Sequence, residues 1–208
     1  MSARLPADNY VLPMPAVNHF LLKKICDVLL IILMLPIAIP GLILGMALTW
    51  LSSKGPVIFV QKRVGLGGKI FTLYKIRTMV YQPGGYQEFT VPNDKRITKV
   101  GRLLRKTKMD ELPQLLNVLK GDMSLIGPRP ERVDIATYFC MVDKNYAYRH
   151  CIKPGITGLA QVNCPMATPH ENLIRLNFDL YYIRNFSFLL DIEILIKTIG
   201  IVFRMKGL

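Results

Sequence analysis

The stretch VLLIILMLPIAIPGLILGMALTWL, from Val28 to Leu51, contains no charged side chain. A run of about 20 apolar residues is long enough to cross a lipid bilayer as an α-helix. The stretch is long for the core of a signal peptide, and no clear A-x-A cleavage site follows it. We therefore expect a retained membrane helix.

Two prolines, Pro36 and Pro40, lie near the middle of this apolar stretch. A proline inside a helix removes a hydrogen bond and clashes with the preceding turn, which costs about 3 kcal/mol. Lys23 and Lys24 precede the stretch and Lys54 follows it, and positive charge marks the cytoplasmic side of a membrane. We expect a re-entrant helix, broken at the prolines, with both ends in the cytoplasm. A kinked helix that crosses the bilayer once is the alternative.

The formal net charge is +13 in 208 residues. Most of this excess lies between Lys54 and Lys108, where Glu88 and Asp94 are the only acids. A positive field of this kind attracts nucleic acid, anionic lipid or phosphorylated small molecules, and a solvated basic face is the alternative. The sequence has no recognition-helix signature and no basic motif interleaved with aromatic residues, so we expect no nucleic-acid partner.

The cysteines form no C-x-x-C pair, and the histidines are scattered, so a zinc centre is not expected. Reduced cysteines fit a body that faces the cytosol. The residues concerned are Cys26, Cys140, Cys151, Cys164, His19, His150 and His170.

The chain after the apolar stretch is expected to be mostly helical, with one β-hairpin. Residues 57–61 and 70–75 are strand-like, and a glycine cluster at 65–68 joins them. Residues 98–106 and 112–119 are expected to form helices, the second ending at Gly121. Residues 81–93 are expected to form a loop. The apolar residues 186–203 include charges, which favours an interfacial or core helix over a spanning one.

An acidic pair, Asp110 and Glu111, lies between the two expected helices. Pro113 is tolerated only in a first helical turn, so the pair is placed at a helix N-terminus, where the dipole stabilises negative charge. An ionised carboxylate can attack phosphorus or hold a divalent metal. Arg105 and Lys108 precede the pair and could balance a bound diphosphate. A simple acidic helix cap is the alternative.

Two loops of turn-forming residues each present a cation. The first, GDMSLIGPRP at 121–130, carries Arg129, and the second, KPGITG at 153–158, begins with Lys153. Arginine suits two-point contact with phosphate oxygens.

Several motifs in order make the sequence resemble the small monotopic phosphoglycosyl transferases, also called bacterial sugar transferases. The resemblance runs from about Lys23 to the C-terminus. It rests on KKICD at 23–27, GPV at 55–57, YKIRTM at 74–79, RITKVGRLLR at 96–105, residues 110–130, PGITG at 154–158, QVN at 161–163 and DLYY at 179–182.

The resemblance implies a re-entrant helix broken at Pro36 and a two-step reaction that depends on Mg²⁺. Asp110 would attack the sugar-bearing phosphate of a UDP-sugar, release UMP and carry a phosphosugar, which polyprenyl phosphate would then accept. Glu111 would complete the acidic dyad, Asp110 would also be a metal ligand, and Arg105 and Arg129 would bind phosphate.

Three positions depart from the commonest family pattern. Lys153 stands where many members have arginine, Leu159 replaces an aromatic residue, and residues 164–166 replace Gly-Arg-Asn. These changes bear on nucleotide and sugar preference, and Lys153 keeps the charge of a substrate-binding residue.

The expected fold is therefore α+β and mostly helical, with a small β-hairpin and an N-terminal re-entrant membrane helix. Residues 1–22 would be an N-terminal extension, 23–53 the re-entrant helix and 54–208 a catalytic domain with interfacial helices, which faces the cytoplasm at the inner membrane. The expected partners are a UDP-sugar, polyprenyl phosphate and membrane lipid, and the sequence assigns no oligomeric state. The alternative function is a non-catalytic basic module that binds anionic lipid at the membrane surface.

Overall fold

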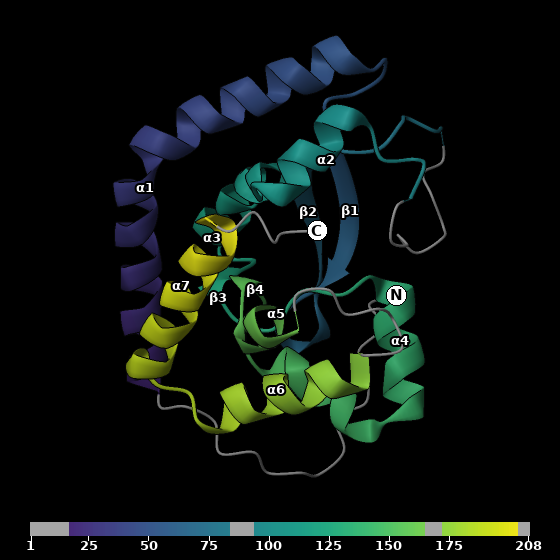
Figure 1. Cartoon of the computed structure of the whole chain (residues 1–208). Helices are drawn as coiled ribbons and strands as arrows, with labels where there is room; N and C mark the ends of the chain where they lie inside the picture. The colour runs from purple at the N-terminus through teal and green to yellow at the C-terminus, as the bar shows by residue number, and fades with distance from the viewer. Residues whose placement is uncertain (1–16, 84–93, 165–171, 204–208) are drawn as a thin grey trace.

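A computed structural model describes residues 17–83, 94–164 and 172–203 (Figure 1). Most of the predicted extension, 1–22, and of the predicted loop, 81–93, lies outside these ranges. The fold is mostly helical with a small antiparallel strand pair, so the α+β prediction is confirmed.

Helix α1 extends from Val17 to Ser52 and contains both Pro36 and Pro40. It begins earlier than predicted and does not end at the prolines. Figure 1 shows that it bends sharply, with one leg beside α7 and the other passing over α2. Because a proline removes a helical hydrogen bond, the two prolines account for the bend. Within the described residues, α1 is the one helix long and apolar enough to cross a membrane.

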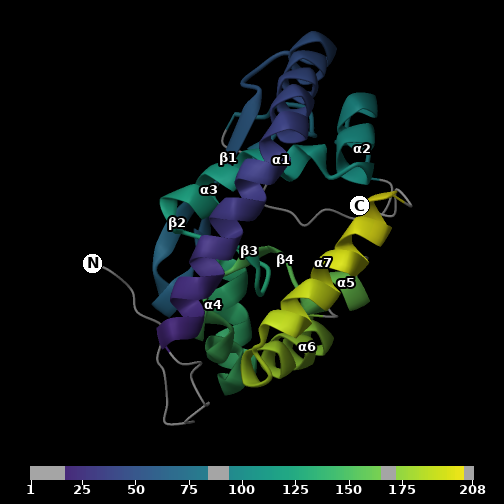
Figure 2. The same cartoon turned by 90° about the vertical axis from the view of Figure 1, so that its left-hand side faces the viewer.

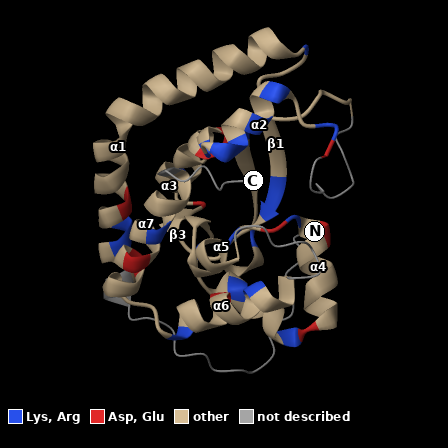
Figure 3. Cartoon of the chain, in the orientation of Figure 1, with Lys and Arg blue, Asp and Glu red and all other residues tan. Residues whose placement is uncertain are grey.

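One face of α1 packs on the rest of the chain and the opposite face does not. Ile31 and Ala38 are buried, whereas Leu33, Ile37 and Leu51 are 74%, 82% and 73% exposed. Figure 3 shows that most of the helix carries no charged residue. An exposed apolar surface of this extent is typical of a site that contacts a membrane or another protein.

The predicted hairpin is confirmed. Strands β1 (Ile58–Val64) and β2 (Ile70–Ile76) pair antiparallel with Ile58 opposite Ile76 and Val64 opposite Ile70. The short 3-10 helix η1 (Leu66–Gly68) forms the connection.

The two helices expected around the acidic pair are present with altered boundaries. Helix α2 (Lys99–Lys106) is capped by Thr98, whose Oγ1 accepts a hydrogen bond from the Gly101 N–H at 2.8 Å. The predicted helix at 112–119 is divided into a 3-10 segment, η2 (Met109–Gln114), and α3 (Leu115–Lys120). Pro113 lies inside η2 and has no N–H to donate, which favours the later start of the α-helix. Gly121 ends α3 with a positive φ of 83°, as glycine does readily.

The two predicted loops lie side by side and form a second, parallel sheet. Strand β3 (Ser124–Ile126) pairs with β4 (Gly155–Thr157). A methyl group on Gly127 would lie 2.4 Å from the Lys153 carbonyl oxygen, so only glycine permits this approach. The sequence analysis did not predict this pairing.

Five further segments complete the described structure. They are α4 (Val133–Val142), the 3-10 segment η3 (Lys144–Cys151), α5 (Leu159–Asn163), α6 (Asn172–Arg184) and α7 (Phe188–Phe203). Figure 2 shows that α7 lies near the start of α1 at one end and slants away from it at the other. The main core is buried between these elements and the hairpin, and includes Ile31, Leu73, Val118, Met123, Ile126, Tyr182 and Ile194.

Candidate active site

The acidic pair lies in η2, directly beneath the second leg of α1. A methyl group on Gly41 would lie 3.4 Å from Leu112 Cδ1, and one on Gly45 would lie 3.9 Å from Met109 Cε. Leu112 and Met109 of η2 therefore lie against this part of α1. Asp110 and Glu111 are both buried, at 3% and 7% exposure, and lie beside the helix that carries the exposed apolar face.

Lys75 forms ion pairs with both members of the acidic pair. Its Nζ lies 3.3 Å from Asp110 Oδ2 and 3.3 Å from Glu111 Oε1. Lys75 belongs to the YKIRTM motif at 74–79, and no role at the site was predicted for it. Strand alternation offered a signal, because Lys75 lies on the same face of β2 as the buried Phe71 and Leu73.

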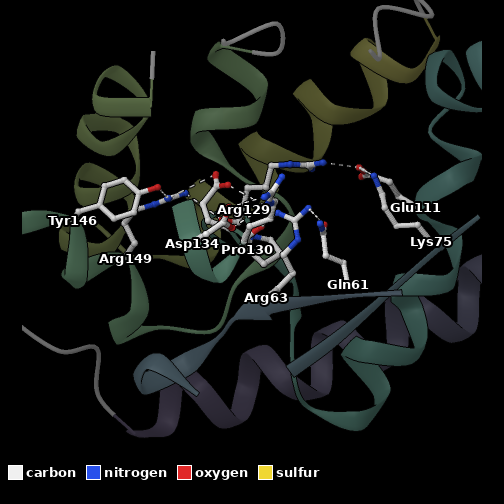
Figure 4. A network of polar contacts seen from close by, with 11 residues as sticks. Gln61, Arg63, Lys75, Glu111, Arg129, Pro130, Asp134, Tyr146 and Arg149 are labelled. Atoms are coloured by element: carbon white, nitrogen blue, oxygen red, sulfur yellow. Dashed lines mark hydrogen bonds and ion pairs between the residues drawn. The ribbon is translucent and has the colours of Figure 1, made fainter. Parts of the chain in front are cut away.

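Arg129 approaches Glu111 from the segment after β3. Its Nη2 donates to Glu111 Oε1 at 2.9 Å (Figure 4). Burial by itself raises the pKa of Glu111, but Arg129, Lys75 and Lys108 outweigh burial and hold that pKa well below its usual range. The same contact raises the pKa of Arg129. Arg129 and Glu111 are thus paired in the structure, and the role of Arg129 in binding phosphate stays a prediction.

The second carboxylate oxygen of Asp110 takes no part in these ion pairs. Its Oδ1 is buried and has no hydrogen-bond partner among the described residues. Buried polar atoms are almost always paired, so an unpaired one calls for an explanation in a ligand, an ion or a reaction.

A bound Mg²⁺ in a phosphate site usually takes one or two carboxylates, substrate phosphate oxygens and water. Within the described ranges no group of three or more His, Cys, Asp or Glu side chains could hold a metal by itself. The unpaired oxygen of Asp110 nevertheless fits a metal that a diphosphate substrate also binds. The residues present are therefore compatible with the predicted ion.

Arg105 lies in the same charged cluster but binds a neighbouring hydroxyl. Its Nε donates to Thr78 Oγ1 at 2.9 Å. Burial lowers the pKa of Arg105, and the carboxylates of Asp110 and Asp94 oppose that shift. Its Nη groups remain the part of the fork that could meet a phosphate.

Lys108 is held in a strained position immediately before η2. Its φ is 60°, the single positive φ of a non-glycine residue in the described ranges. Backbone strain of this kind costs roughly 1–3 kcal/mol and concentrates at functional sites. Burial lowers the pKa of Lys108, while Glu111 counteracts the shift. Lys108 thus adds a further cation to the site.

Lys153 lies away from the acidic pair. A methyl group on Gly121, after the last turn of α3, would lie 3.6 Å from Lys153 Nζ. The acidic pair precedes the first turn of the same helix. The role of Lys153 in binding substrate stays a prediction.

A second layer of polar contacts holds the main chain around Arg129. Arg149 Nη2 donates to the Arg129 carbonyl oxygen at 3.2 Å, and Arg63 Nη1 donates to the Pro130 carbonyl oxygen at 3.0 Å. Arg149 is itself fixed by Asp179 Oδ2, 2.7 Å from its Nε, and by the Tyr146 hydroxyl (Figure 4). The sequence analysis missed this layer, since its members are far apart in the chain.

Comparison with known proteins identifies the family of the chain. The family described as bacterial sugar transferase matches residues 18–205. The chain belongs to this family. The family resemblance predicted from the sequence is therefore confirmed.

Individual relatives of the bacterial sugar transferase family are about equally similar. The UDP-N-acetylgalactosamine-undecaprenyl-phosphate N-acetylgalactosaminephosphotransferase of Aeromonas hydrophila is 42% identical over 188 residues, 89% of this chain and 44% of that protein. The UDP-glucose:undecaprenyl-phosphate glucose-1-phosphate transferase of Escherichia coli is 42% identical over 194 residues, 91% of this chain and 42% of that protein. An uncharacterized sugar transferase, EpsL, of Bacillus subtilis is 43% identical over 188 residues, 90% of each chain. The chain thus spans less than half the length of the first two relatives and most of the third.

Proposed function

We propose that this sugar transferase moves a sugar 1-phosphate from a UDP-sugar to polyprenyl phosphate and releases UMP. The observation that carries the proposal is a buried carboxylate, Asp110, with one unpaired oxygen in the described structure and with Lys75 beside the other. The relatives from Aeromonas hydrophila and Escherichia coli are named for transfers to undecaprenyl phosphate. Membership of the same family supports the same class of reaction here.

In the first step a carboxylate oxygen of Asp110 attacks the phosphorus that bears the sugar. The bond between this phosphorus and the bridging oxygen breaks, UMP leaves with that oxygen, and the phosphosugar remains on Asp110 as an acyl phosphate. The negative charge on the phosphoryl oxygens is offset by the cations at the site. Lys75, Arg105, Lys108 and Arg129 supply that charge.

In the second step an oxygen of polyprenyl phosphate attacks the same phosphorus. The bond to Asp110 breaks, the carboxylate is restored, and a polyprenyl diphosphate sugar forms. The acceptor is a membrane lipid, so the site must lie at the bilayer surface. The close packing of η2 on Gly41 and Gly45 of α1 supports that position.

We also propose Mg²⁺ as the cofactor. When bound, it neutralises the diphosphate and polarises the phosphoryl oxygens. The Asp110 carboxylate would hold the ion together with substrate oxygens, as its unpaired atom allows within the described structure. Glu111 is already committed to Lys75 and Arg129, which it orients.

The membrane arrangement that we propose is a re-entrant α1 with the body at the cytoplasmic face of the inner membrane. The bend in α1 and the lysines at both ends of its apolar stretch support this arrangement (Figure 1).

The test is UMP release from UDP-sugars, with and without polyprenyl phosphate, by the purified chain in lipid nanodiscs. Release that is stoichiometric without acceptor and catalytic with it, together with a phosphosugar on an Asp110 peptide, is expected. The alternative, a basic module that binds anionic lipid, predicts vesicle binding without UMP release. Catalytic release without any labelled Asp110 peptide would instead argue for direct transfer to the lipid.

A further inference from the structure

A buried carboxylate on α1, Asp27, binds the strand that leads to the active site. Asp27 is 7% exposed, although it immediately precedes the apolar stretch. Its Oδ2 accepts a hydrogen bond from Ser124 Oγ at 2.7 Å, and its Oδ1 accepts one from the Leu125 backbone N–H at 3.3 Å. Burying a carboxylate is costly unless it is hydrogen-bonded, so these contacts define where α1 meets β3.

Strand β3 continues directly into the segment that carries Arg129. Gly127, at the start of that segment, donates its N–H to the Thr157 carbonyl oxygen at 2.9 Å. The Gly155 N–H in turn donates to the Pro128 carbonyl oxygen at 2.9 Å. Because two backbone hydrogen bonds join this segment to β4 and Gly127 has no space for a side chain, we expect a shift of β3 to move Arg129 as well. The Arg129 guanidinium reaches Glu111 at 2.9 Å.

A second polar contact fastens α1 to α6 and α7 one helical turn before Asp27, and the charges of Lys23 and Asp191 act on the Asp27 carboxylate without a hydrogen bond to it. Lys23 Nζ lies 2.5 Å from Asp191 Oδ2 on α7, and the Tyr182 hydroxyl donates to Asp191 Oδ1 at 2.6 Å. None of the contacts described for these three residues involves Arg129 or the acidic pair. The Lys23–Asp191 contact therefore offers a matched control for the contacts of Asp27 with β3.

We propose that Asp27 is a positioning residue for the transfer reaction: by fixing β3 to the membrane helix, it holds the Arg129 guanidinium against Glu111. The inference rests on the proposed function and adds that the seating of α1 bears on catalysis as well as on anchoring. Asp27 belongs to the KKICD motif at 23–27, for which the sequence predicts no role in the reaction.

The experiment compares Asp27→Asn and Ser124→Ala with Asp191→Asn in the full chain in nanodiscs. Asparagine keeps the size of Asp27 but has a single side-chain acceptor for two donors, and Ser124→Ala removes one donor. We expect Asp27→Asn to lower kcat for UMP release about tenfold. A tenfold change corresponds to about 1.4 kcal/mol, which is close to the contribution of one hydrogen bond to a charged group. Ser124→Ala should act in the same direction, and Asp191→Asn should lower the Tm yet keep kcat within about twofold of the wild type.

A double variant that combines Asp27→Asn with Arg129→Lys distinguishes a positioning role of Asp27 from a merely structural one. If Asp27 acts through Arg129, Asp27→Asn should change kcat by less than about twofold once Arg129 has been replaced. Equal effects of Asp27→Asn in both backgrounds, or an equal loss of kcat in Asp191→Asn, would overturn the inference.

If the wild type releases no UMP, the proposed function is refuted but the positioning role of Asp27 is not. Amide hydrogen exchange then tests that role without an activity assay. Asp27→Asn should speed amide exchange in residues 124–132, and Asp191→Asn should not. Unchanged exchange in that segment in Asp27→Asn would refute the positioning role whatever the activity.

Discussion

Lys75 Nζ lies 3.3 Å from Asp110 Oδ2, whereas Asp110 Oδ1 is buried with no partner in the described part of the chain. One carboxylate oxygen is thus paired with a cation, and the other is unpaired and can meet a ligand or take part in the reaction. The lysine reaches the pair from β2, so the hairpin contributes to the site although it lies far from Asp110 in sequence.

Replacement of Asp110 by asparagine should abolish turnover. The amide preserves shape and burial but cannot form an acyl phosphate, so we expect UMP release to fall by about 1,000-fold or more. Thermal unfolding should show that the variant remains folded. Asp122→Asn makes the same chemical change outside the pair and should remain active. A near-normal rate in Asp110→Asn would remove Asp110 from the role of nucleophile.

Chelation should stop the reaction. A carboxylate and a diphosphate repel each other unless their charge is neutralised, and the described residues offer no complete metal cage. Titration with EDTA should abolish UMP release, and Mg²⁺ should restore it while Na⁺ at equal ionic strength should not. Rates unchanged by EDTA would contradict the need for a metal.

Stability should fall between neutral pH and pH 5 because of His150. Burial, with a smaller effect of Arg149, lowers the pKa of His150 from 6.5 to about 4. The folded state keeps the ring neutral while the unfolded chain binds a proton, so the contribution is full above pH 6.5 and is lost as pH falls towards 4. The full loss is about 3 kcal/mol. Denaturant titrations from pH 7 to pH 5 (about the window in which an unfolded histidine titrates) should show this slope, and His150→Gln should flatten it. Equal slopes in both proteins would show that another group is responsible.

Two glycine-to-alanine changes should have opposite effects on stability. A methyl group on Gly101 would lie 2.0 Å from the Thr78 carbonyl oxygen, so α2 would have to move and carry Arg105 with it. We expect a loss of at least about 2 kcal/mol and lower activity. A methyl group on Gly200, in α7, meets no described atom within 4 Å. There alanine should raise stability by about 0.5–1 kcal/mol. Similar Tm values for both variants would contradict the packing at Gly101.

Both ends of α1 should face the cytoplasm. Single cysteines at Asn9 and Ser52, in a background without the native cysteines, can be treated on intact cells with a thiol reagent that does not cross membranes. A re-entrant helix predicts that both stay protected until the cells are opened. If Asn9 is labelled from outside, α1 crosses the bilayer once, and the bend at Pro36 and Pro40 is only a kink.

Much of the secondary structure followed from local pattern. The strand-like residues and the glycine cluster predicted the β1–β2 hairpin, and apolar spacing predicted the helix at 98–106, which is α2. The predicted start of the second helix, at residue 112, was wrong, because α3 begins at Leu115. The 3-10 turn around Pro113 depends on how η2 packs under α1. Local propensity does not include that contact.

The sequence by itself determined that the chain has an apolar helix with two prolines, a basic body and an acidic pair within family motifs, because these are properties of neighbouring residues. Only the tertiary structure decided which cations meet the pair: Lys75 and Arg129 bind Glu111, and Lys153 lies elsewhere. It also decided that two loops become one parallel sheet and that Asp27 binds it. The physical reason is that an ion pair or a buried hydrogen bond depends on distances between segments far apart in the chain. Those distances are set by the packing of α1, the hairpin and α7 around a shared core.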